Sequence, residues 1–182
     1  MDSSLYKKTE EFVVNAFKKA NKPTDVFHAQ RTAYWIKELK PDADISLLIS
    51  GLAHDIERAF YGDWKKGSSN PKDLEKHQNL SALEIEKFLQ KENVDKNIIE
   101  RVKMLIAHHE EGGNEDQNIL CDADCLAYFE EKALRNAKEY KQEGKEEEMK
   151  KKLKYVFSRI SSLKAKQIVQ KWYKEALQEL DL

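Results

Sequence analysis

The amino-acid sequence predicts an all-α fold, a compact bundle of helices, and three observations support this. Apolar residues recur at three- and four-residue steps along most of the 182 residues, which is the spacing of one face of a helix. The chain has only six glycines and three prolines, the residues that most strongly interrupt helices. No stretch alternates apolar and polar residues with the period of two that a half-buried strand requires.

Caps, prolines and glycine-rich stretches divide the chain into successive helical segments. Thr24 or Asp25 is expected to cap the second segment, and Pro41 separates it from the third. Loops rich in glycine, serine and asparagine are expected at residues 61–73 and 110–118. The predicted helices cover residues 4–20, 25–39, 42–56, 73–91, 93–109, 118–140 and 153–177.

Charge and composition argue against several classes of protein. The 32 basic and 33 acidic residues give a net charge of −1, so nothing points to nucleic acid or an anionic membrane as partner. No apolar run approaches the roughly 18 residues of a membrane span, and the N-terminus resembles no signal peptide. The two cysteines, Cys121 and Cys125, imply no disulfide framework. We expect a cytoplasmic protein, with a homodimer left open.

All five histidines lie near the ends of predicted helices, where residues of a bundle can converge on one pocket. A single histidine or a capping aspartate is usually structural, so any prediction depends on the set as a whole. The set comprises His28 at the start of the second segment, His54 and Asp55 at the end of the third, His77 early in the fourth, His108 and His109 at the end of the fifth, and Asp122 and Asp124 at the start of the sixth.

Imidazole nitrogens and carboxylate oxygens together predict a site for a divalent transition metal, namely Mn, Fe, Co, Ni or Zn. One ion would be held by His28, His54, Asp55 and one aspartate of the sixth segment. A second ion would be held by His77 and one histidine of the 108/109 pair, with Asp55 shared between the two ions. Two ions a few ångströms apart can hold a phosphate and activate a water between them.

Three stretches resemble the HD superfamily of metal-dependent phosphohydrolases. They are "VFHAQRTAYWIKEL", "LLISGLAHDIERAF" and "ILCDADCLAYFEE", and the resemblance covers about residues 10–135. It implies an α-helical bundle of the HD-domain type, here with a long C-terminal helical extension. It also implies metal ligands at His28, His54, Asp55 and Asp124.

The resemblance favours Asp124 over Asp122, because members place this ligand between a small residue and X-Leu. The additional histidines, His77 with His108 or His109, resemble those of members that bind two metal ions. "HHE" is also similar to the cyclic-di-GMP phosphodiesterase branch, but the Gly-Tyr-Pro that follows there is missing here. The sequence therefore assigns no particular substrate.

After the His-Asp doublet the chain departs from the family pattern, with Glu57 and Arg58 where many members have glycine and lysine. Asp55 is expected to bind metal and orient the nucleophile, Glu57 to act as a base beside the metal ligands, and Arg58 to meet a phosphate. Arg31, Lys65 and Lys66 are expected to bind substrate. The alternatives are a surface position for Arg31 and a solvated loop for the two lysines.

We expect residues 1–140 to form the HD-type metal-binding domain. Residues 141–182 would add a charged connector and an amphipathic helix packed on the same domain. The basic turn "SRISSLKAK", which contains Arg159, is expected to be exposed to solvent.

Three functions fit these residues. The favoured one is hydrolysis of a small phosphorylated molecule or nucleotide, as phosphomonoester or phosphodiester, by water that the metal activates. The second is a di-iron oxygenase of the same superfamily, which shares the order of ligands and would consume oxygen. The third is a non-catalytic, metal-stabilised nucleotide-binding module. The complete ligand set favours an enzyme over the third.

Overall fold

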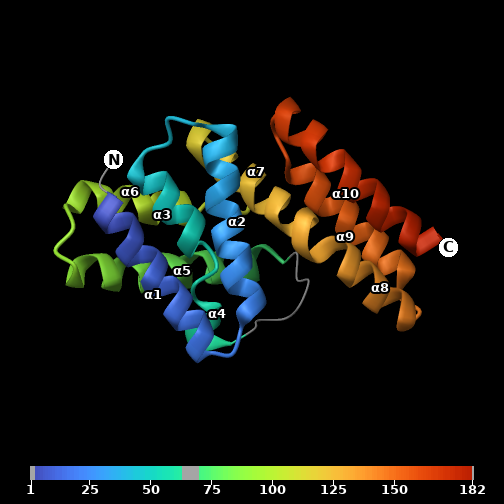
Figure 1. The fold of residues 1–182 in the computed structure, drawn as a ribbon, viewed down its shortest axis with the longest axis horizontal. Helices are drawn as coiled ribbons and strands as arrows, with labels where there is room; N and C mark the ends of the chain where they lie inside the picture. The colour runs from blue at the N-terminus through green and yellow to red at the C-terminus, as the bar shows by residue number, and fades with distance from the viewer. Residues whose placement is uncertain (1–2, 63–69, 182) are drawn as a thin grey trace.

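The computed structural model describes residues 3–62 and 70–181, and in these ranges it contains helices and turns but no strand, which confirms the all-α prediction (Figure 1). None of the described helices has the length and apolar character needed to cross a membrane. The elements are α1 (Ser3–Lys19), α2 (Pro23–Leu39), α3 (Ile45–Ala53), α4 (Arg58–Tyr61), α5 (Pro71–Lys91), α6 (Lys96–Ile106), α7 (Glu115–Tyr128), the π-helical turn η1 (Phe129–Ala133), α8 (Leu134–Gln142), α9 (Glu146–Arg159) and α10 (Leu163–Asp181).

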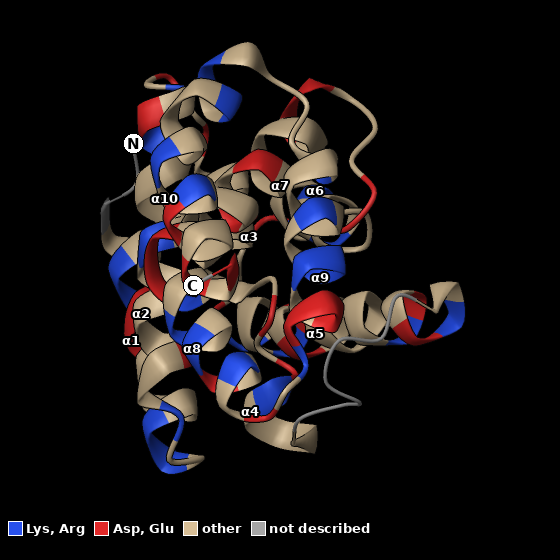
Figure 2. Ribbon diagram, turned by 90° about the vertical axis from the view of Figure 1, so that its right-hand side faces the viewer, with Lys and Arg blue, Asp and Glu red and all other residues tan. Residues whose placement is uncertain are grey.

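Helix α2 lies at the centre of the fold, packed against α3 on one side and α7 on another (Figure 1). Helix α1 covers α2 and α3, and α5 pairs with α6. One buried apolar cluster joins these N-terminal helices, and a second joins α2, α3 and α7 to the C-terminal helices α8–α10. Along the helices in Figure 2, basic and acidic residues are interspersed, in keeping with the net charge of −1.

Two predicted helices end earlier than the apolar periodicity indicated, and in both cases the histidines lie just beyond the end. Helix α3 ends at Ala53 and α6 at Ile106. Beyond these ends there are backbone bonds that span three residues, from the Ile56 N–H to the Ala53 carbonyl at 3.1 Å and from the His109 N–H to the Ile106 carbonyl at 3.3 Å. Such tighter turns rotate the following side chains away from the directions that a regular helix would give them.

The expected cap of the second helix at Thr24 or Asp25 is wrong. Helix α2 begins at Pro23, whose fixed φ and missing N–H suit the first helical position. The expected helix over residues 118–140 begins earlier, at a capping box formed by Asn114 and Gln117, and is interrupted by η1.

The expected single last helix is two helices, α9 and α10. They are separated at residues 160–162 because a buried carboxylate from α7 captures the backbone there: Asp122 accepts hydrogen bonds from the N–H groups of Ser161 at 2.6 Å and Ser162 at 3.0 Å. The Ser161 hydroxyl donates a further bond to it.

Helix α10 packs on the rest of the chain through its aromatic residues. The Trp172 ring meets Trp35 of α2 edge-on, with centroids 5.9 Å apart. Tyr173 stacks on Phe157 at 4.6 Å and meets Phe129 of η1 at 5.7 Å. Cys121 and Cys125 are free, buried thiols in the same cluster.

Asp122→Asn should destabilise the protein, because the amide group turns a donor toward backbone N–H groups that need an acceptor. We expect the free energy of unfolding to fall by about 1–3 kcal/mol, the cost of leaving buried polar groups unsatisfied. Chemical denaturation measures this, with Asp42→Asn, at an exposed aspartate, as the control. Equal stability of both variants and the wild type would contradict the role of Asp122.

Candidate metal centre

Helices α2, α3 and α7 bring three of the predicted ligands together, and we call His28, His54 and Asp124 the first donor group. Nε2 of His28 lies 3.0 Å from Asp124 Oδ1, and Nε2 of His54 lies 3.4 Å from the same oxygen. Gly51 favours the close approach of α3 to α2, since a Cβ there would lie 3.3 Å from the backbone Cα of Ala33 as well as 2.5 Å from Ile36 Cδ1. A glycine one turn before His54 therefore helps to bring its ring toward His28.

Asp55, His77 of α5 and His109 form the second donor group. Nε2 of His77 lies 3.0 Å from Asp55 Oδ1 and 3.3 Å from Nε2 of His109, which is itself 4.0 Å from that oxygen. These separations are close to those between ligands of one transition-metal ion, which are about 3.0–3.4 Å for bonds of about 2.1 Å.

The two groups are contiguous because their members His54 and Asp55 are adjacent in the chain. Asp55 directs Oδ1 to the second group, while its Oδ2 lies 3.8 Å from His54 Nε2. The rings of His54 and His109 are 5.1 Å apart. All six donor residues are at most 8% exposed, so six polar groups share one buried region.

Backbone carbonyls fix the tautomers of two of these histidines. His54 Nδ1 lies 3.0 Å from the carbonyl oxygen of Gly51, and His109 Nδ1 lies 2.8 Å from that of Ile106. A carbonyl oxygen can only accept, so each Nδ1 donates the bond. In the neutral ring this leaves a lone pair on Nε2, the atom that faces the other donors, as in metal-binding histidines.

The other two histidines face carboxylates with Nδ1. Nδ1 of His77 lies 2.6 Å from Glu57 Oε1, and the Ser81 hydroxyl donates to Glu57 Oε2 at 2.6 Å. His28 Nδ1 lies 4.0 Å from Glu131 Oε2, and both atoms are buried without a hydrogen-bond partner among the described residues. A carboxylate therefore lies behind each of these rings, and at His77 it makes a hydrogen bond.

Burial and neighbouring charges separate the pKa values of the histidines. Burial lowers the pKa of His28 to about 4, and burial together with the nearby His54 and His77 holds the pKa of His109 well below its usual value. For His77, hydrogen bonds to Asp55 and Glu57 outweigh burial and raise the pKa to about 10. His28 and His109 are thus neutral near pH 7, the form that binds metal, whereas His77 holds a proton in the metal-free protein.

Both aspartates stay ionised despite their burial. Burial favours the neutral form of Asp55, but the charges of Arg58 and His54 hold its pKa well below the usual value. The hydrogen bond with His28, the nearby His54 and the charge of Arg159 do the same for Asp124, again against the effect of burial. His54 Nε2 is buried without a hydrogen-bond partner in the described chain, so the donor set fits a cation.

The sequence left open which member of two pairs faces the centre, and the structure distinguishes between them. His109 lies in the second donor group, whereas His108 is exposed. Asp124 lies in the first donor group, whereas Asp122 caps the turn between α9 and α10. Asp122 and Asp124 are two residues apart on α7 and therefore point in nearly opposite directions, and His108 and His109 follow each other in the turn after α6.

The described contacts of Arg31 do not place it at the donor groups. Its guanidinium makes two bonds of 2.7 Å to Glu130 and lies over the ring of Tyr34 at 3.9 Å. The paired carboxylate in η1 therefore explains its position better than the expected substrate contact does. Lys65 and Lys66 lie outside the described residues.

Sequence reasoning missed Glu110 and Arg159, which border both donor groups. Arg159 was expected in an exposed turn, which is wrong: its side chain is 10% exposed and lies 3.2 Å from Asp124 and 3.0 Å from Glu110. Glu110 follows His109 directly, so its place in the chain was a signal. Arg159 lies 35 residues after Asp124, and nothing in the sequence links the two.

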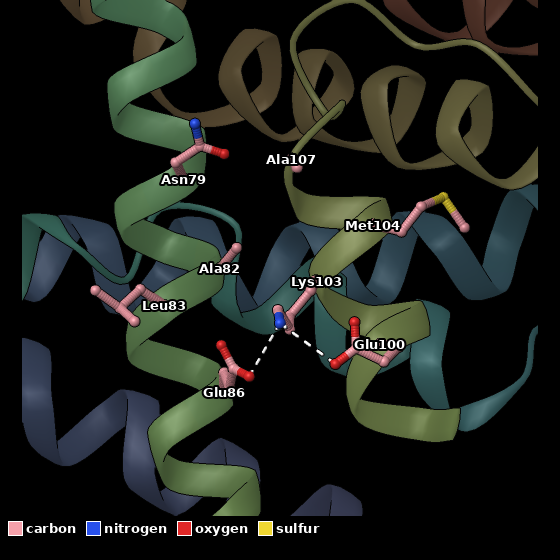
Figure 3. Close-up of a pocket in the computed structure, with 8 residues that line it drawn as sticks. All are labelled: Asn79, Ala82, Leu83, Glu86, Glu100, Lys103, Met104 and Ala107. Atoms are coloured by element: carbon pink, nitrogen blue, oxygen red, sulfur yellow. Dashed lines mark hydrogen bonds and ion pairs between the residues drawn. The ribbon is translucent and has the colours of Figure 1, made fainter. Parts of the chain in front are cut away.

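Two surface cavities lie away from this centre. Figure 3 shows the one between α5 and α6, where Lys103 bonds Glu86 and Glu100. The other lies between α1 and α5, around Phe12 and Phe88. Neither is lined by a donor residue, and the donor residues themselves are buried.

One family model matches the chain, over residues 8–180, with the description "Domain of unknown function (DUF4202)". Because the match covers nearly the whole chain, the chain belongs to this family. No curated protein matches the chain, and no solved structure matches it. The family description names no activity, so the function has to be argued from the site itself.

His109→Gln should remove the second ion, because it deletes one of three converging donors. We expect about one ion fewer per chain after equilibrium dialysis against Mn²⁺ or Co²⁺, measured by elemental analysis. The neighbouring His108→Gln is the matched control and should keep the full stoichiometry. If the two variants bound equal amounts of metal while folded by circular dichroism, His109 would not be a ligand.

Metal affinity should rise with pH, because an ion at the second donor group has to displace the proton of His77. With a pKa of about 10 in the metal-free protein, the logarithm of the affinity should increase with a slope of at least about +1 per pH unit between pH 6 and 9. Titrations across this range measure the slope, and an affinity independent of pH would contradict the assignment.

Proposed function

We propose that this member of the DUF4202 family is a metal-dependent phosphohydrolase of the HD type, acting on a small phosphorylated molecule or nucleotide. One observation carries the proposal: two triads of buried imidazole and carboxylate donors lie side by side, joined by the adjacent residues His54 and Asp55. Paired sites of this kind suit in-line displacement at phosphorus.

The donor types suit Mn, Fe, Co, Ni or Zn. Ions bound there would lower the pKa of water and offset charge on the phosphoryl oxygens. His28, His54 and Asp124 would hold one ion, and His77 and His109 the other. Asp55 presents one carboxylate oxygen toward each group, which supports a shared ligand.

Arg58 supports an anionic substrate. Its Nη1 lies 2.7 Å from Asp55 Oδ2, and its side chain is 24% exposed, against 7% for Asp55. The guanidinium is thus tied to the centre, while about a quarter of the side chain stays exposed to solvent. A cation in this place can offset charge that develops on a phosphoryl group, which is the role we propose for Arg58.

For Glu57 we propose a role different from the expected one of a base. Both of its carboxylate oxygens are engaged, one by His77 and the other by Ser81, and the residue is 2% exposed. We therefore propose that it positions His77 and raises the basicity of its Nε2, and that it does not take a proton from the nucleophile. Asp55 is the remaining carboxylate for orienting the nucleophile.

We place the activity in the cytoplasm, because two free thiols suit a reducing compartment. The same donors would serve a di-iron oxygenase, so the assay has to follow oxygen as well as phosphate. Arg58 favours the hydrolase, since it offers charge for a phosphoryl group.

Protein loaded with Mn²⁺ or Co²⁺ should release phosphate or alcohol from at least one class among phosphomonoesters, phosphodiesters and nucleotides. Asp55→Asn should lower the rate by at least about 100-fold, since even outer partners of metal ligands contribute about 10–100-fold. His108→Gln should keep the full rate.

Oxygen consumption with iron, without phosphate release, would replace the hydrolase by the oxygenase. Inactivity in both assays, with metal bound, would leave the non-catalytic module.

A further inference from the structure

Glu110 lies beside the second donor group with one carboxylate oxygen turned toward its imidazoles. Oε1 is 3.7 Å from His109 Nε2 and 4.0 Å from His77 Nε2. These are the two nitrogens that also converge with Asp55. The side chain of Glu110 is only 12% exposed, although it follows a buried histidine in a turn where a carboxylate could have faced solvent.

Arg159 of α9 holds the other side of this carboxylate. Its Nη2 lies 3.0 Å from Glu110 Oε2, and its Nε donates to the Glu110 carbonyl at 3.0 Å. Nη2 also reaches the His109 carbonyl at 3.2 Å. The guanidinium thus fixes both the side chain of Glu110 and the turn that carries it.

The same guanidinium reaches the first donor group. Arg159 Nη2 lies 3.2 Å from Asp124 Oδ2, while Asp124 Oδ1 faces His28 and His54. Glu110 is arranged in the same way, with Oε2 on Arg159 and Oε1 toward the imidazoles. One cation therefore holds one carboxylate beside each group and leaves the second oxygen of each directed inward.

We propose that Glu110 is a further ligand of the ion at the second donor group, and that Arg159 positions Glu110 and Asp124 together. This inference rests on the proposed metal site. Helix α9 then sets the geometry at both ions, which gives the C-terminal segment a part in the centre. A movement of about half an ångström brings Oε1, now 3.7 Å from His109 Nε2 and 4.0 Å from His77 Nε2, to the spacing of ligands on one ion.

The decisive variant is Glu110→Gln, which keeps the size of the side chain. The neighbouring Glu111→Gln is the matched control, because Glu111 is exposed and accepts a bond from Gln78. Competition with a chromogenic chelator gives the affinity for each ion, and the visible absorption of bound Co²⁺ reports the ligands around it. Circular dichroism reports folding.

We expect Glu110→Gln to weaken one of the two Co²⁺ ions by at least about 10-fold, as loss of a neighbouring carboxylate does at metal sites, and to change its absorption. Glu111→Gln should match the wild type. Arg159→Lys should weaken both ions by smaller factors, because a single ammonium cannot reproduce the geometry with which the guanidinium contacts both carboxylates.

The role of Glu110 is overturned if Glu110→Gln binds both ions like the wild type with an unchanged Co²⁺ spectrum. In that case a loss of one ion in His109→Gln would leave the proposed metal site standing. If neither His109→Gln nor Glu110→Gln changes metal binding, the metal site itself fails. The role of Arg159 is overturned if Arg159→Lys, folded like the wild type, binds both ions with wild-type affinity.

Discussion

The burial of two carboxylates among four imidazoles is the constraint on which the rest of the structure depends. Burying a carboxylate without a partner costs several kcal/mol of stability. In this fold one arginine lies beside each of the two carboxylates. Asp55 and Asp124 each turn one oxygen to the imidazoles, and the other lies near an arginine, Arg58 at 2.7 Å and Arg159 at 3.2 Å. Because Arg58 follows Asp55 by three residues whereas Arg159 comes from α9, the centre requires both local and distant parts of the chain.

This requirement explains why the helices that carry the site end where they do. A regular helix would carry the residues after α3 and α6 onward around its axis, whereas the three-residue turns after Ala53 and Ile106 leave carbonyls of Gly51 and Ile106 to accept from the rings of His54 and His109. The backbone that ends each helix thereby orients the ring that follows it. Similarly, the π-helical turn η1 carries Glu131, whose Oε2 lies 4.0 Å from Nδ1 of His28.

Much of this could be predicted from the sequence, and several of the failures share one cause. Apolar periodicity predicted the helices, and the spacing of five histidines with the His-Asp doublet predicted the residues that converge. The split between α9 and α10 and the neighbours of Arg31 and Arg159 depend on partners distant in the chain, whereas the starts of α2 and α7 follow local features, Pro23 and the Asn114–Gln117 capping box. Glu130 is 99 residues from Arg31, and Asp122 is 39 from Ser161. A local sequence pattern cannot predict contacts between residues so far apart in the chain.

The position of the doublet also favours two ions over one. His54 and Asp55 follow the end of α3, where a tighter turn replaces the regular helix. In the structure His54 Nε2 faces Asp124 at 3.4 Å, while Asp55 Oδ1 faces His77 at 3.0 Å. The two side chains diverge into different donor groups, and the 3.8 Å between His54 Nε2 and Asp55 Oδ2 keeps the groups adjacent. With this divergence, the doublet would suit two cations at the short separation that a bridging carboxylate requires.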